Sequence, residues 1–222
     1  MMKSTRSGRK STIFLLGVLL GLSFSPLLET KAQIQQTERY EINQKGSDEY
    51  FTVISLEEDG LALVREKNKY KGNKQLWEII ILDINLQEKS KFDIEINQRH
   101  TLLGYEIARN RLYLLFRTGE TTKNDLELVA LSTAEGTETG RYEITPELDF
   151  KVTHFSKVGP NIILGGYVTN EPAILLYQAA DNSIKVIPGF FQKDNELVEL
   201  RVNQNETFNA VLLDRSLRSE RK

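Results

Sequence analysis

Few residues in this 222-residue chain could carry out acid–base or metal chemistry. There are two histidines, His100 and His154, and no cysteine, which excludes disulfides, thiolate metal sites and a cysteine nucleophile. Each histidine lies on a predicted first strand of a repeat unit, where its side chain could face a central channel. Their spacing is not a metal motif, and the two positions do not align between units. We therefore interpret both as structural or surface histidines.

Carboxylates are more numerous, and three groups are close enough in sequence to act together. Paired acids can carry out glycosidase chemistry or hold calcium. However, there is no Asp-x-Asp-x-Asp-Gly loop, and the acids within a strand alternate with apolar residues, as on a solvated face. Simple surface charge is the preferred interpretation of all three groups, which are Glu57, Glu58 and Asp59 in one turn, Asp93 and Glu95 on one strand, and Glu147 and Asp149 in a linker.

Other chemical signatures are absent or weak. Gly165-Gly166 lies within a strand pattern and lacks the further glycine and the helix of a phosphate-binding loop. No Gly-x-Ser-x-Gly elbow occurs. One basic loop could contact an acidic polymer or a membrane surface, but we interpret it as a hairpin tip kept soluble by charge; it contains Lys67, Lys69, Tyr70, Lys71 and Lys74. The sequence therefore assigns no catalytic, cofactor-binding or metal-binding residue and predicts no cofactor.

The elements that position these residues are predicted to be strands. From Tyr50 onward, apolar residues come in runs of four to seven, too short for amphipathic helices. A pattern of four strands recurs about every fifty residues. The third strands are almost continuously apolar, whereas the fourth strands alternate apolar and charged residues as edge strands do. The repeat units start near residues 50, 100, 150 and 196, and their second strands contain Leu61, Leu112, Ile162 and Phe208.

Four antiparallel strands per unit are typical of a β-propeller blade. We predict an all-β, propeller-like fold over residues 50–214, with about three and a half four-stranded blades and an incomplete ring. A sandwich or open meander with accidentally regular spacing is the alternative. The last unit has two predicted strands before a charged tail at 215–222. Two interpretations stay open: the N-terminal part of a longer propeller, or an open stack of sheets that must cover its last face.

One predicted blade resembles a known repeat. Tyr167-Val168-Thr169-Asn170 spells the name-giving motif of the YVTN-type β-propeller repeat. The segment that resembles the repeat runs from Gly166 to Gly189 and continues with an apolar strand, a turn at Asp181-Asn182 and a further strand. The corresponding places in the first two units depart from the motif. The resemblance implies a propeller architecture in a surface or envelope protein, and it implies no catalytic residues.

The N-terminal segment is predicted to direct export. Residues 1–32 combine a basic start, a short apolar run and small residues before a cut after Ala32, as in a secretory signal peptide. A retained membrane anchor is the alternative, although the run is shorter than the roughly twenty residues of a spanning helix. Residues 33–49 are a predicted linker, in which residues 38–43 could form a ring-closing strand because Arg39–Ile42 repeats the sequence Arg-Tyr-Glu-Ile of residues 141–144.

These features predict a secreted or periplasmic protein. Without residues 1–32 the chain keeps 24 basic and 30 acidic side chains, a formal net charge of −6, which argues against nucleic acid as a partner. We expect no membrane contact after signal removal. The predicted function is an exported binding or scaffold protein of the cell envelope that contacts a protein or a glycan through loops at the blade ends. The alternative is the N-terminal fragment of a propeller hydrolase or lyase. We also expect self-association through an uncapped last blade.

Overall fold

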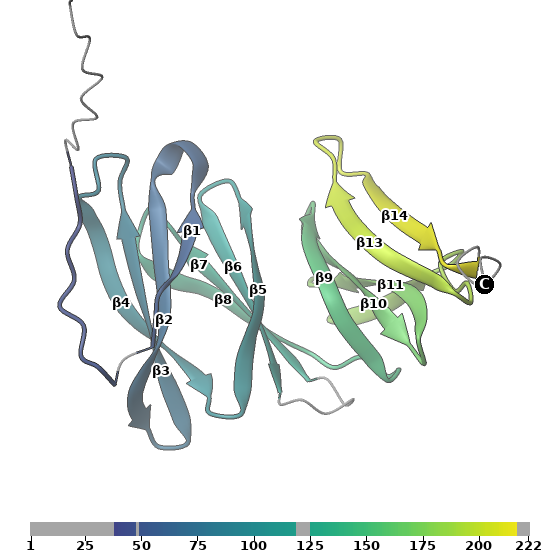
Figure 1. Ribbon diagram of the computed structural model, residues 1–222, viewed down its shortest axis with the longest axis horizontal. Coiled ribbons are helices and arrows are strands. Elements are labelled where there is room, and N and C mark those ends of the chain that lie inside the picture. The colour runs from purple at the N-terminus through teal and green to yellow at the C-terminus, as the bar shows by residue number, and fades with distance from the viewer. Residues whose placement is uncertain (1–37, 48, 119–124, 217–222) are drawn as a thin grey trace, which may run out of the picture. The chain divides into compact units, whose positions relative to one another are not determined.

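The computed structural model describes residues 38–47, 49–118 and 125–216 (Figure 1). In these ranges the regular structure is β-strand, apart from a 3₁₀ turn at Glu57–Asp59 and a 3₁₀ residue at Ser216. The first three repeat units each form one four-stranded antiparallel sheet in simple meander order. Blade 1 contains β1 (Thr52–Ser55), β2 (Leu61–Lys71), β3 (Lys74–Leu82) and β4 (Glu88–Asn97).

The following units repeat this order. Blade 2 contains β5 (His100–Ala108), β6 (Arg111–Thr118), β7 (Leu126–Ser132) and β8 (Thr137–Ile144). Blade 3 contains β9 (Phe150–Val158), β10 (Asn161–Val168), β11 (Glu171–Gln178) and β12 (Ser183–Ile187). The fourth unit is a two-stranded hairpin of β13 (Asn195–Val202) and β14 (Phe208–Asp214).

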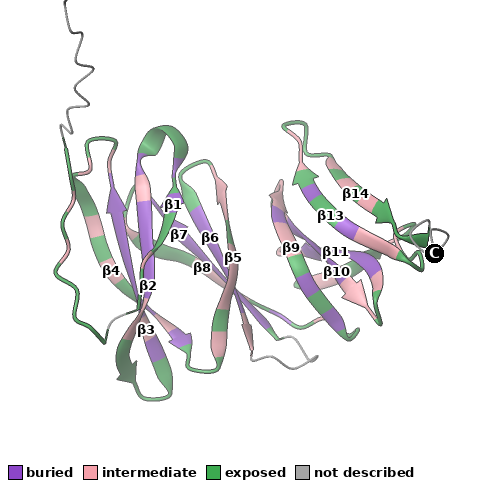
Figure 2. Ribbon diagram, in the orientation of Figure 1, coloured by how far each residue is buried: buried purple, intermediate pink, exposed green. Residues whose placement is uncertain are grey.

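Burial follows the predicted difference between middle and edge strands (Figure 2). All seven residues of β7 are buried, as expected for a strand covered on both faces. The outer strand β4 instead alternates exposed and buried positions, with Ile94 and Ile96 pointing inward. Uninterrupted apolar runs therefore form the middle of each blade, and alternating runs form its rim.

Neighbouring sheets share apolar cores. Trp77 of blade 1 meets Phe116 of blade 2 edge to face, with ring centroids 5.1 Å apart, inside a cluster drawn from both blades. A second cluster joins blade 2 to blade 3 and includes Leu115 and Phe150. A third places Leu200 of the hairpin against Ile163 of blade 3. The all-β, propeller-like fold of about three and a half blades is confirmed, because successive four-stranded sheets bury their apolar faces against each other.

The N-terminal segment covers one face of blade 1. Residues 38–43 belong to no strand, and Tyr40 and Ile42 pack half-buried on a cluster of Leu63, Ile80 and Leu82. Their role in closing a ring stays a prediction. The predicted signal peptide at 1–32 lies outside the described residues, as do residues 217–222 of the charged tail. Within the described ranges, no helix is long and apolar enough to cross a membrane.

Candidate functional site

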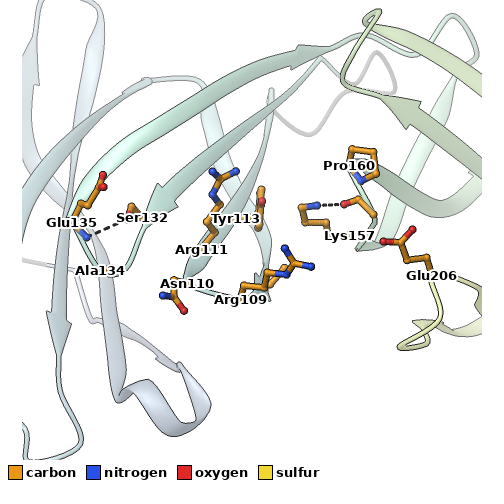
Figure 3. Close-up of a pocket in the computed structure, with 12 residues that line it drawn as sticks. Arg109, Asn110, Arg111, Tyr113, Ser132, Ala134, Glu135, Lys157, Pro160 and Glu206 are labelled. Atoms are coloured by element: carbon orange, nitrogen blue, oxygen red, sulfur yellow. Dashed lines mark hydrogen bonds between the residues drawn. The ribbon is translucent and has the colours of Figure 1, made fainter.

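The candidate site is a hollow of about 930 Å³ where turns from blade 2, blade 3 and the hairpin meet (Figure 3). Its buried floor is formed by Tyr113 on β6 and Ser132 at the end of β7. Its rim is formed by short turns, which offer polar side chains at a fixed place on a rigid scaffold. The remaining residues around it are Ala108, Arg109, Asn110, Arg111, Ala134, Glu135, Lys157, Gly159, Pro160 and Glu206.

Tight hairpin register places two arginines on this rim. Ala108 pairs with Arg111 across β5 and β6, so Arg109 and Asn110 form the whole turn. Arg109 accordingly has a positive φ of 55°. The carbonyl of Asn110 accepts a hydrogen bond from the N–H of Thr133, 3.0 Å away, which ties this turn to the β7–β8 loop. Arg109 therefore lies in a braced turn, and Arg111 lies beside it at the start of β6.

The third cation comes from blade 3. Lys157 lies on β9, and its ammonium donates to the carbonyl of Gly159 in the next turn. The same ammonium lies over the ring of Tyr113, 5.6 Å from the centroid, in a cation–π contact that spans the two blades. Burial lowers the pKa of Lys157 below its ordinary value, and the charges of Arg111 and Arg109 lower it further.

The positive charge in the hollow is incompletely neutralised. Arg109 and Arg111 form no ion pair with any described side chain, although both are close enough to lower the pKa of Lys157. Glu206 is the acid whose charge acts on Lys157, and it does so from the hairpin turn without forming an ion pair. Figure 3 shows Glu135 on the opposite side of the hollow from Lys157 and Glu206. An anion entering here would meet three positive groups.

His100 takes part in a polar network away from this hollow. Its Nδ1 lies 2.7 Å from Oε2 of Glu127, and its Nε2 lies 2.7 Å from the hydroxyl of Thr118. The order hydroxyl, imidazole, carboxylate matches that of a hydrolase triad. However, the Thr118 hydroxyl donates its hydrogen to the carbonyl of Asp125 at 3.1 Å, so this hydrogen is not directed at His100. Glu127 is also bonded to Arg141. The network cross-links the strands of blade 2.

The two histidines do not meet. His154 lies on β9 opposite Gly165, and its Nδ1 is 2.8 Å from the hydroxyl of the adjacent Thr153. No group of three or more His, Cys, Asp or Glu side chains able to hold a metal ion occurs in the part of the chain that the structure describes.

The acidic groups singled out from the sequence are dispersed. Asp93 pairs with Lys67 at 3.0 Å and Glu95 pairs with Lys71, both across the sheet of blade 1. Half of the predicted basic loop is thus neutralised by its own blade. Glu57, Glu58 and Asp59 form the 3₁₀ turn, and Glu147 lies on the rim of a separate hollow near β12.

The three cations of the hollow were not singled out from the sequence. Arg109-Asn110 and Gly159-Pro160 are turn-forming pairs in equivalent positions of the sequence repeat, which is the signal that could have found the site. Their charges come from two units, and only the packing of blade 2 on blade 3 brings them together.

Comparisons with known proteins give little further information. No protein-family model matches the sequence, and no curated protein matches it either. Among solved structures, an ACO/RPE65 chimera is similar at 9% identity with a TM-score of 0.41, over 62% of this chain and 38% of that one. A subtype N10 neuraminidase-like protein of A/little yellow-shouldered bat/Guatemala is similar at 11% identity with a TM-score of 0.41, over 63% of this chain and 44% of that one. The chain thus spans less than half the length of each.

Proposed function

We propose that the chain is an exported binding module of the cell envelope that holds an anionic group of its ligand among Arg109, Arg111 and Lys157. The observation that carries the proposal is the set of three cations around one hollow, two of which have no ion-pair partner among the described residues. Guanidinium groups bind carboxylates and phosphates through paired, charge-assisted hydrogen bonds. Such a site binds its ligand without catalytic chemistry.

Export and envelope location rest on the sequence. The segment 1–32 has the charge and length pattern of a cleaved signal, and Gly166–Gly189 resembles the YVTN-type repeat. Mass spectrometry of the protein recovered from its native host, with the N-terminus sequenced, tests this part: we expect the mature chain to begin at Gln33. An N-terminus at Met1 in the cytoplasmic fraction would contradict it.

Binding is tested with simple probes. Galacturonate and inorganic phosphate, titrated into ¹⁵N-labelled protein, should shift the amide signals of Arg109, Arg111 and Gly159, whereas neutral galactose should not. The double variant Arg109→Gln/Arg111→Gln should weaken binding of the anions by about tenfold or more, because charge-assisted bonds are lost. The matched control is Arg99→Gln, which removes an exposed charge from the β4–β5 turn. Absence of binding by both anions, or equal losses in the control, would contradict the proposal.

The protonation of Lys157 gives this site a pH dependence. Burial and two neighbouring cations hold the pKa of Lys157 below its ordinary value. The ammonium therefore loses its proton at a lower pH than that of a surface lysine. A bound anion favours the charged form of Lys157, so binding is accompanied by proton uptake at pH values where the free protein has begun to lose this proton. We expect the anion affinity of the wild type to fall as pH rises through the lowered pKa of Lys157, and the affinity of Lys157→Arg to stay constant over the same range.

A further inference from the structure

A second hollow adjoins the first at the hairpin turn. It has a volume of about 570 Å³ and is lined by five consecutive residues, Arg201, Val202, Asn203, Gln204 and Asn205. Glu206, the next residue, lines the first hollow. Consecutive Cα atoms are about 3.8 Å apart, so a single turn separates the two hollows, and a ligand longer than one small group can extend over it.

The groups in the second hollow differ from those in the first. Arg201 is exposed and has no ion-pair partner among the described side chains. Oδ1 of Asn205 accepts from the N–H and the hydroxyl of Thr207, which leaves its amide Nδ2 without a described partner. The amide of Gln204 also makes no hydrogen bond with described residues. The hollow therefore presents one guanidinium beside the Gln204 amide, which can donate and accept, and the Asn205 Nδ2, which can donate.

This combination matches a particular ligand chemistry. Guanidinium groups bind carboxylates, and side-chain amides bind hydroxyl groups, which can donate and accept in the same way. A uronic acid residue carries one carboxylate and several hydroxyl groups on a rigid ring. A phosphate chain would accept hydrogen bonds from the arginines and from the amide N–H groups, but it would leave the amide oxygen of Gln204 without a donor.

Resting on the function proposed above, we infer that the ligand is an acidic oligosaccharide of the uronate class, which binds as a chain across the hairpin turn with one carboxylate among Arg109, Arg111 and Lys157 and another at Arg201. Glu206 lies at the crossing point and repels the chain. When one oligosaccharide occupies both hollows, its second carboxylate binds as part of a ligand that is already attached. Affinity therefore increases with the length of the oligosaccharide without any new kind of interaction.

The test compares chain lengths and variants. Galacturonic acid and its linear dimer, trimer and hexamer are titrated calorimetrically into the full chain at fixed ionic strength, because charge contacts weaken with salt. We expect the hexamer to bind about tenfold or more tightly than the monomer. Arg201→Gln should remove most of this gain. Arg99→Gln serves again as the charge-matched control and should change neither the affinity of the monomer nor that of the hexamer.

A gain-of-affinity variant separates these effects from misfolding. Glu206→Gln keeps the shape of the side chain, which lies in a turn with a positive φ of 61°, and removes the repelling charge. It should tighten hexamer binding severalfold. A polyphosphate of equal charge tests whether charge alone suffices, and we expect it to bind more weakly than the hexamer.

The outcomes are distinguishable. Equal affinities of monomer and hexamer, no effect of Arg201→Gln on the hexamer, or equal binding of polyphosphate would overturn the oligosaccharide inference and leave the anion-binding function intact. If neither galacturonate nor phosphate of any length binds, the proposed function fails as well.

Discussion

At the scale of single residues, one tyrosine connects blade 3 to the hairpin. The hydroxyl of Tyr167 accepts a hydrogen bond from the N–H of Leu197 at 2.9 Å, and it lies 3.5 Å from the carbonyl oxygen of Leu197. Leu197 is next to a bulge in β13, where the ladder with β14 shifts its register. The side chain therefore ties the backbone of β13 beside its bulge to blade 3, which gives the first residue of the Tyr167–Asn170 motif a structural role.

Removing this hydroxyl should destabilise the protein. In Tyr167→Phe the Leu197 N–H loses its partner in a half-buried place, so we expect the free energy of unfolding to fall by about 1–2 kcal/mol in urea titrations. Tyr105→Phe, at a tyrosine with 43% exposure, is the matched control and should have almost no effect. Equal effects of the two variants would refute the structural role.

A buried acid in blade 1 makes stability depend on pH. Glu78 is 4% exposed, and Oε2 lies 2.7 Å from Nη2 of Arg65, while Lys91 is 3.3 Å from Oε1. Burial alone would raise the pKa of Glu78, but the hydrogen bonds and charges of Arg65 and Lys91 outweigh it and lower the pKa below 4.5. The folded protein thus holds this carboxylate ionised more strongly than the unfolded chain does.

The sign of the pH effect follows from this difference. As pH falls through the ordinary pKa, the unfolded chain takes up a proton first, so the contribution of Glu78 to stability is present above that pKa and is lost as pH falls through the lowered folded value. We expect the free energy of unfolding of the wild type to decline between about pH 5 and pH 3. The free energy of unfolding of Glu78→Gln should decline less over this pH range. At neutral pH this variant should be less stable than the wild type by about 3 kcal/mol. An identical pH profile for the two proteins would contradict this.

At the scale of elements, a bulge shapes the strand pair that carries Lys157. Gly165 pairs with His154 but Gly166 pairs with Val152, so β9 has one extra residue at this point. A Cβ on Gly166 would lie 2.1 Å from the carbonyl oxygen of Lys151, closer than any side chain can approach. The two strands can pair this closely only because position 166 is glycine.

Gly166→Ala tests this requirement. The added methyl must push β9 away from β10, and we expect a loss of about 3 kcal/mol in chemical denaturation. Gly46→Ala is the control, because nothing lies within 4 Å of a Cβ at that position. A variant as stable as the wild type would show that the bulge can relax at little cost.

At the scale of the whole described chain, stability comes from contacts between successive units. Each shared cluster joins one sheet to the next, as in repeat proteins whose stability is a sum of neighbour interfaces. The hairpin shares an apolar cluster with a neighbouring sheet on one of its faces. Leu197 and Leu200 point toward blade 3, whereas Val198, Val211 and Leu213 are 51%, 48% and 47% exposed.

The exposed face of the hairpin leads us to expect self-association. Sedimentation velocity should show a concentration-dependent increase in the sedimentation coefficient of the wild type, because exposed apolar side chains favour association. Val211→Lys should abolish it, and Val186→Lys, on β12 with a comparable exposure of 45%, should not. A wild type that stays monomeric at all concentrations would refute the expectation.

The strand architecture could be predicted from sequence because it depends on local pattern. Residues two positions apart lie on the same face of a strand. The apolar run at Leu126–Ser132 therefore indicated a middle strand, and the alternation at Glu88–Asn97 indicated an outer strand. Turn residues such as Asn110 and Gly159 marked where the strands end. Repetition of this pattern was sufficient to predict blades.

The site could not be predicted in the same way. Arg109 and Lys157 are far apart in sequence, and their charges interact only because blade 2 and blade 3 pack together and bring two separate turns into one hollow. Electrostatic interaction depends on distance in space and on exclusion of water, and neither is encoded in the local pattern. The sequence alone thus determined the strands and their repetition, and the packing of the blades decided which charges act together.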